Sequence, residues 1–137
     1  MNIFELVEPT KTPQLNIVDM LASALPIAVK ELRLHSLPKI HLKASLDDKE
    51  QPTFGHYDSE NRALYVALAN RHPVDVLRTL VHELVHHKQN EDGKLTAASG
   101  ATGSPIEDEA HALAGVIMRN VNKLHPEFLK SDNIELP

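Results

Sequence analysis

The stretch His82-Glu83-Leu84-Val85-His86-His87 decides how the rest of the sequence is interpreted. On a helix, residues four positions apart lie on one face, so the imidazoles of His82 and His86 would converge on one point. Two imidazoles with an open position suit Zn²⁺, whereas Mg²⁺ and Ca²⁺ prefer oxygen ligands. Glu83 would be placed to hold and deprotonate a water bound to the metal. The pattern predicts a zinc hydrolase, and in particular a peptidase.

The residues around the motif predict the helix that this geometry requires. Pro73 suits the first helical position, and Asp92-Gly93 suits a helix end. Between them, apolar residues at helical spacing form one stripe, consisting of Val74, Leu77, Leu80, Val81, Leu84 and Val85. His82 and His86 fall outside this stripe, which argues against a core-filling role for either histidine.

A third metal ligand is expected, because a catalytic zinc usually has three protein ligands and one open position. The chain has no cysteine, so this ligand is a histidine or a carboxylate. A second helix that begins near Ser104 offers Glu107, Glu109 and His111. The apolar stripe predicted for this helix consists of Ile106, Ala110, Leu113, Ile117, Val121 and Leu124.

The choice among these three candidates depends on capping. Glu107 and Glu109 flank the predicted stripe on opposite sides, so helical phase does not separate them. Ser104-x-x-Glu107 forms a capping box, which already gives Glu107 a structural role. Glu109 has no such role and is therefore the predicted ligand, with His111 as the second candidate.

The motif residues resemble a known family. His82-Glu83-x-x-His86 followed by Glu109 resembles the gluzincin pattern, in which a glutamate on a later helix completes the zinc site. The run 109–114 (Glu-Ala-His-Ala-Leu-Ala) is similar to the Glu-Ala-Asn-x-Phe-Ala stretch of ImmA/IrrE-like peptidases. The chain also resembles small SprT-like domains, which use a histidine as third ligand, and short proteins encoded by tailed phages.

The resemblance covers roughly residues 39–124 and implies a minimal zincin-like metallopeptidase. Zn²⁺ would be the cofactor, a peptide or protein the substrate, and Glu83 the general base that passes a proton to the leaving amine. The donor that stabilises the oxyanion stays open among Tyr57, Tyr65, His56, His87 and His111. The alternative hypothesis is a non-catalytic zincin-like module, with a binding, regulatory or phage structural role and a structural metal.

Composition narrows the class of protein. At 137 residues and 42% hydrophobic content, the sequence predicts a single domain over residues 1–137. The formal net charge of −5, without a basic stripe, predicts no nucleic-acid partner. No apolar run reaches the length of a membrane span and no signal-peptide pattern begins the chain, so no membrane partner is predicted. With no cysteine, a cytoplasmic location is expected.

The remaining elements predict an α+β fold, in which helices pack on one side of a small antiparallel sheet. A helix is expected over residues 13–34, with a kink or split near Ala24 caused by Pro26. Further expected elements are an extended arm or strand over 1–12, strands over 39–44, 54–57 and 63–68, and a short helix or irregular tail after 126. The resemblance implies that the strand over 63–68 borders the cleft and pairs with substrate. Gly115, in the middle of the second helix, predicts close packing against another backbone.

Overall fold

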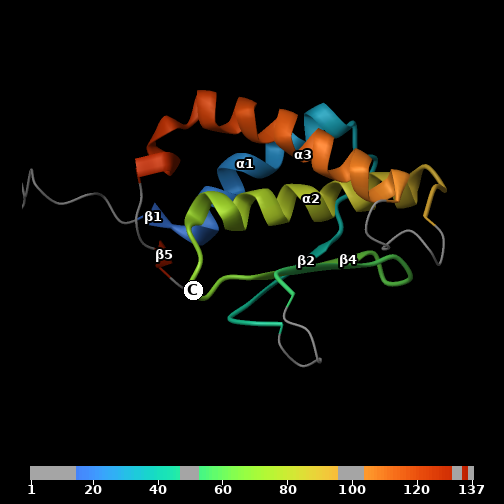
Figure 1. Ribbon diagram of the computed structural model, residues 1–137, viewed down its shortest axis with the longest axis horizontal. Coiled ribbons are helices and arrows are strands. Elements are labelled where there is room, and N and C mark those ends of the chain that lie inside the picture. Colours follow the sequence, from blue (N-terminus) through green and yellow to red (C-terminus); the bar gives the residue numbers. More distant parts are fainter. Residues whose placement is uncertain (1–14, 47–52, 96–103, 131–133, 136–137) are drawn as a thin grey trace, which may run out of the picture.

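The computed structural model describes residues 15–46, 53–95, 104–130 and 134–135. Within these residues the chain has an α+β architecture, with three α-helices on one side of a three-stranded sheet (Figure 1). A short 3₁₀ helix follows the last α-helix, as predicted for the tail. The arm predicted over residues 1–12 lies outside the described residues. No helix among those described has the length and apolar character needed to cross a bilayer.

The sheet consists of β2 (Lys39–Lys43), β3 (Gly55–Asp58) and β4 (Ala63–Ala67), in the order β2-β4-β3. A hairpin makes β3 and β4 antiparallel, whereas β2 pairs with the other side of β4 in parallel. The prediction of an antiparallel sheet was therefore wrong for one of the two pairings. Because β4 has a partner on both sides, its backbone cannot also pair with a substrate, and the role predicted for residues 63–68 was wrong. A separate parallel pair joins β1 (Leu15–Asn16) to β5 (Ile134–Glu135).

The first helix, α1 (Ile17–Leu32), is continuous, so of the predicted kink or split near Ala24 the split was wrong. Pro26 lies inside the helix and is exposed to solvent, where its ring does not disturb the packed face. The opposite face carries Ala24 and Ala28, which are completely buried. The side chain of Asn16 accepts a hydrogen bond from the backbone N–H of Val18 and caps the N-terminus.

The motif helix, α2 (Pro73–Glu91), has the predicted start and end. The six residues of its predicted apolar stripe are all buried. Val76 and His87, on other sides of the helix, are buried as well. The reason is that α2 packs against α1, α3, β3 and β4 together, so it forms the centre of the core (Figure 1).

The third helix, α3 (Pro105–Leu124), begins as predicted, and Ala110, Ile117 and Val121 of its predicted stripe are buried, but the centre of the buried face is turned from the predicted one. Leu113 and Leu124, predicted as core residues, are 37% and 64% exposed. The buried residues of the helix are Ala110, Ala114, Ile117, Met118 and Val121. At 100° per residue, the centre of this stripe lies about 45° from the predicted centre, turned toward Glu107.

The glycine of α3 does not have the close neighbour that was predicted for it. A Cβ added to Gly115 would meet no atom within 4 Å. The expectation of tight backbone packing at this position was therefore wrong, and the residue retains only the entropic cost of a glycine within a helix.

Glu91, the last residue of α2, fastens the connection between α1 and β2. Its carboxylate accepts hydrogen bonds from the backbone N–H of His35 at 3.1 Å and from the backbone N–H and hydroxyl of Ser36, both at 2.9 Å. Burial alone would raise the pKa of Glu91, but these hydrogen bonds and the charge of His87 outweigh it and lower that pKa. The ionised carboxylate is therefore the form that the fold stabilises.

We expect Glu91→Gln to lower the free energy of unfolding at pH 7 by about 1–2 kcal/mol, because an ionised acceptor of several hydrogen bonds is lost. The folded pKa lies below the unfolded one, so this contribution is present above about pH 4.5 and disappears as the pH falls through the folded pKa. Urea denaturation of both proteins at pH 7 and pH 3.5 measures the difference. Glu60→Gln, on an exposed turn, is the control, and an equal loss at both pH values would contradict the assignment.

Candidate metal centre

The carboxylate of Glu107 lies between the two motif histidines. Its Oε1 is 2.6 Å from Nε2 of His82, and its Oε2 is 3.3 Å from Nε2 of His86. The two Nε2 atoms are 3.2 Å apart. Donors about 2.0–2.1 Å from a tetrahedral zinc are separated by about 3.3 Å. Two of these three separations are close to that value, whereas the 2.6 Å contact between Glu107 and His82 is a direct hydrogen bond that would have to lengthen around an ion. Burial is the main cause of the lowered pKa of His82, and a lowered pKa favours the neutral imidazole that binds metals.

His111 extends this cluster by one turn of α3. Its ring centroid is 4.8 Å from that of His82. Donor atoms of His82, Glu107 and His111 all lie within 4.8 Å of one another. The cluster therefore brings together four residues that the sequence singled out, with Glu107 at its centre and His82, His86 and His111 around it.

The predicted ligand Glu109 makes its contacts elsewhere. Its Oε1 accepts a hydrogen bond of 2.9 Å from the side-chain amide of Gln89, and its Oε2 lies 3.9 Å from Nζ of Lys94. The rotated stripe of α3 explains the difference, because Glu107 lies about 35° from the centre of the buried face and Glu109 about 125° from it. The structure thus brings Glu107, not Glu109, against His82 and His86.

Gln89, which the sequence prediction did not include, orients His86. Its amide Nε2 donates to the carbonyl oxygen of Ile106 at 3.1 Å and to Glu109. Its Oε1 must then face Nδ1 of His86, 2.8 Å away, and that nitrogen must carry the proton. Nε2 of His86 is left with a lone pair that points into the cluster. The only sequence signal for this role is the position of Gln89, about one turn after His86.

Glu83 is buried under the start of β3, with 6% of its surface exposed. A Cβ added to Gly55 would lie 2.8 Å from Oε2 of Glu83 and 2.6 Å from Cγ2 of Thr79. Only a glycine allows β3 to approach α2 so closely at this point. Burial, and to a lesser extent the charge of Glu107, raise the pKa of Glu83 to about 8. This carboxyl group can therefore gain or lose a proton near neutral pH.

A pocket of about 670 Å³ opens over the motif residues. It runs between Phe54 and Gly55 and the first turns of α2, and it reaches His82, Glu83 and His111. The cluster and the motif glutamate therefore adjoin a space large enough for part of a peptide.

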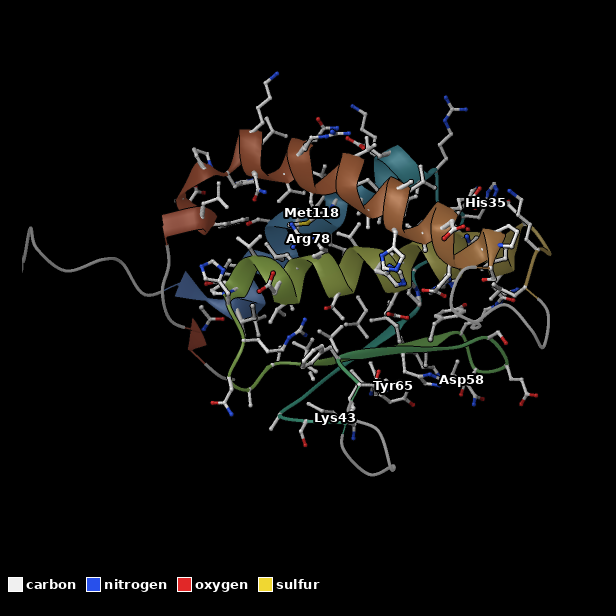
Figure 2. The ribbon with its side chains drawn as sticks, viewed as in Figure 1. His35, Lys43, Asp58, Tyr65, Arg78 and Met118 are labelled. Carbon is white, nitrogen blue, oxygen red and sulfur yellow. The ribbon has the colours of Figure 1, made fainter. Side chains whose placement is uncertain are left out.

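Of the five candidates for an oxyanion donor, His111 lines this pocket. The hydroxyl of Tyr57 lies 2.7 Å from Nδ1 of the buried His87, in a contact between β3 and α2. Tyr65 lies on the side of the sheet that faces away from the helices (Figure 2), stacked on His41 with ring centroids 4.8 Å apart. His56 is next to Tyr65 on the same side. Geometry therefore favours His111.

Comparisons of the chain with models of protein families, with curated protein sequences and with solved structures find no match.

A glycine-to-alanine substitution at Gly55 tests the packing over Glu83, and the same substitution at Gly115 serves as the comparison. We expect Gly55→Ala to lower the free energy of unfolding by about 1–3 kcal/mol, because the added methyl group overpacks the contact with Thr79 and Glu83. Gly115→Ala should instead raise it by about 0.5–1 kcal/mol, since the site is open and the unfolded chain loses freedom. Thermal and urea denaturation measure both, and equal effects would contradict the described geometry.

Proposed function

We propose that this chain is a zinc-dependent peptidase whose metal ligands are His82, His86 and Glu107. The observation that carries the proposal is the Glu107 carboxylate, which contacts Nε2 of both motif histidines. Two imidazoles and one carboxylate form a donor set typical of catalytic zinc, with one coordination position left for chemistry. The proposal replaces the predicted ligand Glu109 by Glu107, which was one of the three original candidates.

The chemistry divides among a few side chains of the chain. A zinc ion bound here would supply Lewis acidity and lower the pKa of water. Glu83 accepts a proton from the attacking water and passes it to the leaving amine. His111, at the pocket wall, donates a hydrogen bond to the carbonyl oxygen as negative charge develops on it. Gly55 keeps the Glu83 carboxyl group in place by packing against it.

The substrate would pair with β3 in this proposal. Within the described chain, β3 is an edge strand whose other side pairs with β4, and its first residue lines the pocket. An extended peptide that adds to this edge would pass over Glu83 and His82. Recognition of this kind reads the main chain of the substrate more than its side chains.

A second candidate function keeps the metal without turnover. His111 lies close enough to His82 and Glu107 to share an ion with them. If His82, His86, Glu107 and His111 all bound the ion, a tetrahedral site would be filled and the metal would be structural. His111→Gln separates the two functions, because a ligand role predicts loss of zinc affinity, whereas an oxyanion role predicts retained zinc and slower hydrolysis.

The choice between the glutamates gives a direct test of the ligand set. We expect Glu107→Gln to weaken zinc binding by more than about 100-fold, beyond the range typical of groups that only orient a ligand. Glu109→Gln keeps an acceptor oxygen for Gln89, so we expect it to weaken zinc binding by no more than about tenfold. Competition with a chromophoric chelator measures both affinities in the full chain. The reverse order would restore Glu109 as the ligand.

The catalytic role of Glu83 is tested separately from metal binding. Glu83→Gln should bind zinc with parental stoichiometry yet hydrolyse a fluorescently labelled unfolded protein about 10²–10⁴-fold more slowly, because general-base catalysis is lost. His82→Ala should lose both the metal and the activity. Asp108→Asn, at an exposed position of α3, is the control. Hydrolysis by Glu83→Gln at the parental rate would rule out the mechanism.

A further inference from the structure

The pocket beside the metal centre contains two arginines, Arg71 and Arg78. Arg71 stands in the turn between β4 and α2, directly after Asn70, whose φ of 58° reverses the chain. Arg78 lies two turns into α2, on the side that faces the pocket. Neither residue contributes to the chemistry proposed above, so their presence in the pocket calls for another role.

The Arg71 guanidinium is held rigidly. Its Nη1 donates to the carbonyl oxygen of Ala67 at 2.8 Å, and its Nη2 donates to the carbonyl oxygen of Asp75 at 3.1 Å and to Oγ1 of Thr79 at 2.6 Å. Its central carbon lies 4.4 Å from the centre of the Phe54 ring. In the described part of the chain, all three hydrogen-bond acceptors of Arg71 are neutral. Its charge is therefore fixed in the pocket and is not neutralised by a directly bonded carboxylate.

Arg78 is in a looser contact. Its Nη1 lies 3.2 Å from a carboxylate oxygen of Asp75, and both side chains are more than half exposed. An exposed ion pair three residues apart on a helix contributes little, so the Arg78 guanidinium can turn toward a ligand at small cost. With Arg71, Arg78 and Asp75 counted together, this end of the pocket carries two positive charges and one negative charge. The net positive charge of this end of the pocket suits the binding of an anion.

The distance from these arginines to the proposed catalytic residues fits a peptide. Arg78 precedes His82 by four residues, and Thr79, which binds Arg71, precedes Glu83 by four. Four residues of helix span about 6 Å along the axis. An extended peptide covers this distance in about two residues.

We propose that Arg71 and Arg78 form a carboxylate-binding subsite, which selects substrates with a carboxylate within two residues of the bond to be cleaved. This inference rests on the proposed peptidase function and names its substrate class. The carboxylate comes from an aspartate or glutamate side chain or from the C-terminus of the substrate, since both present the same group. Arg78 can bind such a group through parallel charge-assisted hydrogen bonds. Arg71, whose Nη2 hydrogens are already donated to the protein, contributes its fixed charge. An amide of the same shape gains neither interaction fully.

The test uses the full chain and two matched pairs of peptides. One pair is acetyl-Ala-Ala-Glu-Ala-amide and its Gln analogue, and the other is acetyl-Ala-Ala-Ala with a free or an amidated C-terminus. Binding is measured by calorimetry and by NMR shifts of the arginine Nε–H signals. Each measurement is made on zinc-free protein and on zinc-loaded Glu83→Gln protein, which prevents turnover. The zinc-free arm excludes direct binding of the carboxylate to metal.

We expect at least one carboxylate peptide to bind about tenfold or more tightly than its amide partner, with or without zinc, and the pair that differs identifies the source. Arg78→Gln should reduce this preference, and Arg71→Gln combined with Arg78→Gln should abolish it. Arg119→Gln, which removes the same charge from an exposed site on α3, should leave it intact. If Arg71→Gln does not fold, Arg78→Gln alone decides, and a preference that this substitution leaves unchanged would contradict the subsite.

Equal binding within both pairs, or a preference that survives loss of both arginines, would overturn the subsite. Failure of the carboxylate-binding subsite can be distinguished from failure of the proposed peptidase function. A carboxylate preference in a protein that hydrolyses no peptide would refute the peptidase and leave the subsite standing. Hydrolysis of peptides without any difference in binding within the pairs would refute the subsite and leave the peptidase function standing.

Discussion

The contact of Glu107 with His82 and His86 is the interaction on which both the fold and the candidate site depend. It joins the first turn of α3 to the middle of α2, the most buried of the three described α-helices. Three polar groups meet there in a largely enclosed space, where loss of any one would leave the others poorly satisfied. The same contact accompanies the rotation of α3 and brings together side chains that could hold an ion.

The groups around this contact hold it from two sides. Gln89 links His86 to Glu109 and to the backbone of Ile106, so α2 and the start of α3 are joined behind the cluster. On the pocket side, Gly55 of β3 packs against Glu83. The proposed base is therefore positioned by a strand outside its own helix, and His86 by a neighbour on the same helix that is itself tied to α3. Such supporting contacts are what a preorganised site requires.

The parts of the structure that depend on local chemistry could be predicted from the sequence, and those that depend on distant contacts could not. Pro73, Ser104 and Pro105 mark helix starts through their own backbone preferences, and the structure confirms both starts. The predicted buried face of α3 included Leu113, yet the helix turns Leu113 outward and packs through Ala114 and Met118 instead. Apolar side chains at the surface are common. With Leu113 counted in the stripe, helical phase did not separate Glu107 from Glu109, and the capping argument then favoured Glu109. The parallel pairing of β2 with β4 was also missed. Strand order is set by pairing between segments far apart in the sequence, which local patterns do not reveal.

The position of Glu107 at the start of α3 has a consequence for folding. The two histidines belong to one helix and could meet an ion in a short helical segment, but the carboxylate reaches them only after α3 has docked. A cation held by all three would add its binding free energy to the assembled state alone. The melting temperature of the chain would then rise with the concentration of free metal, so chelation would weaken the attachment of α3 as well as empty the site.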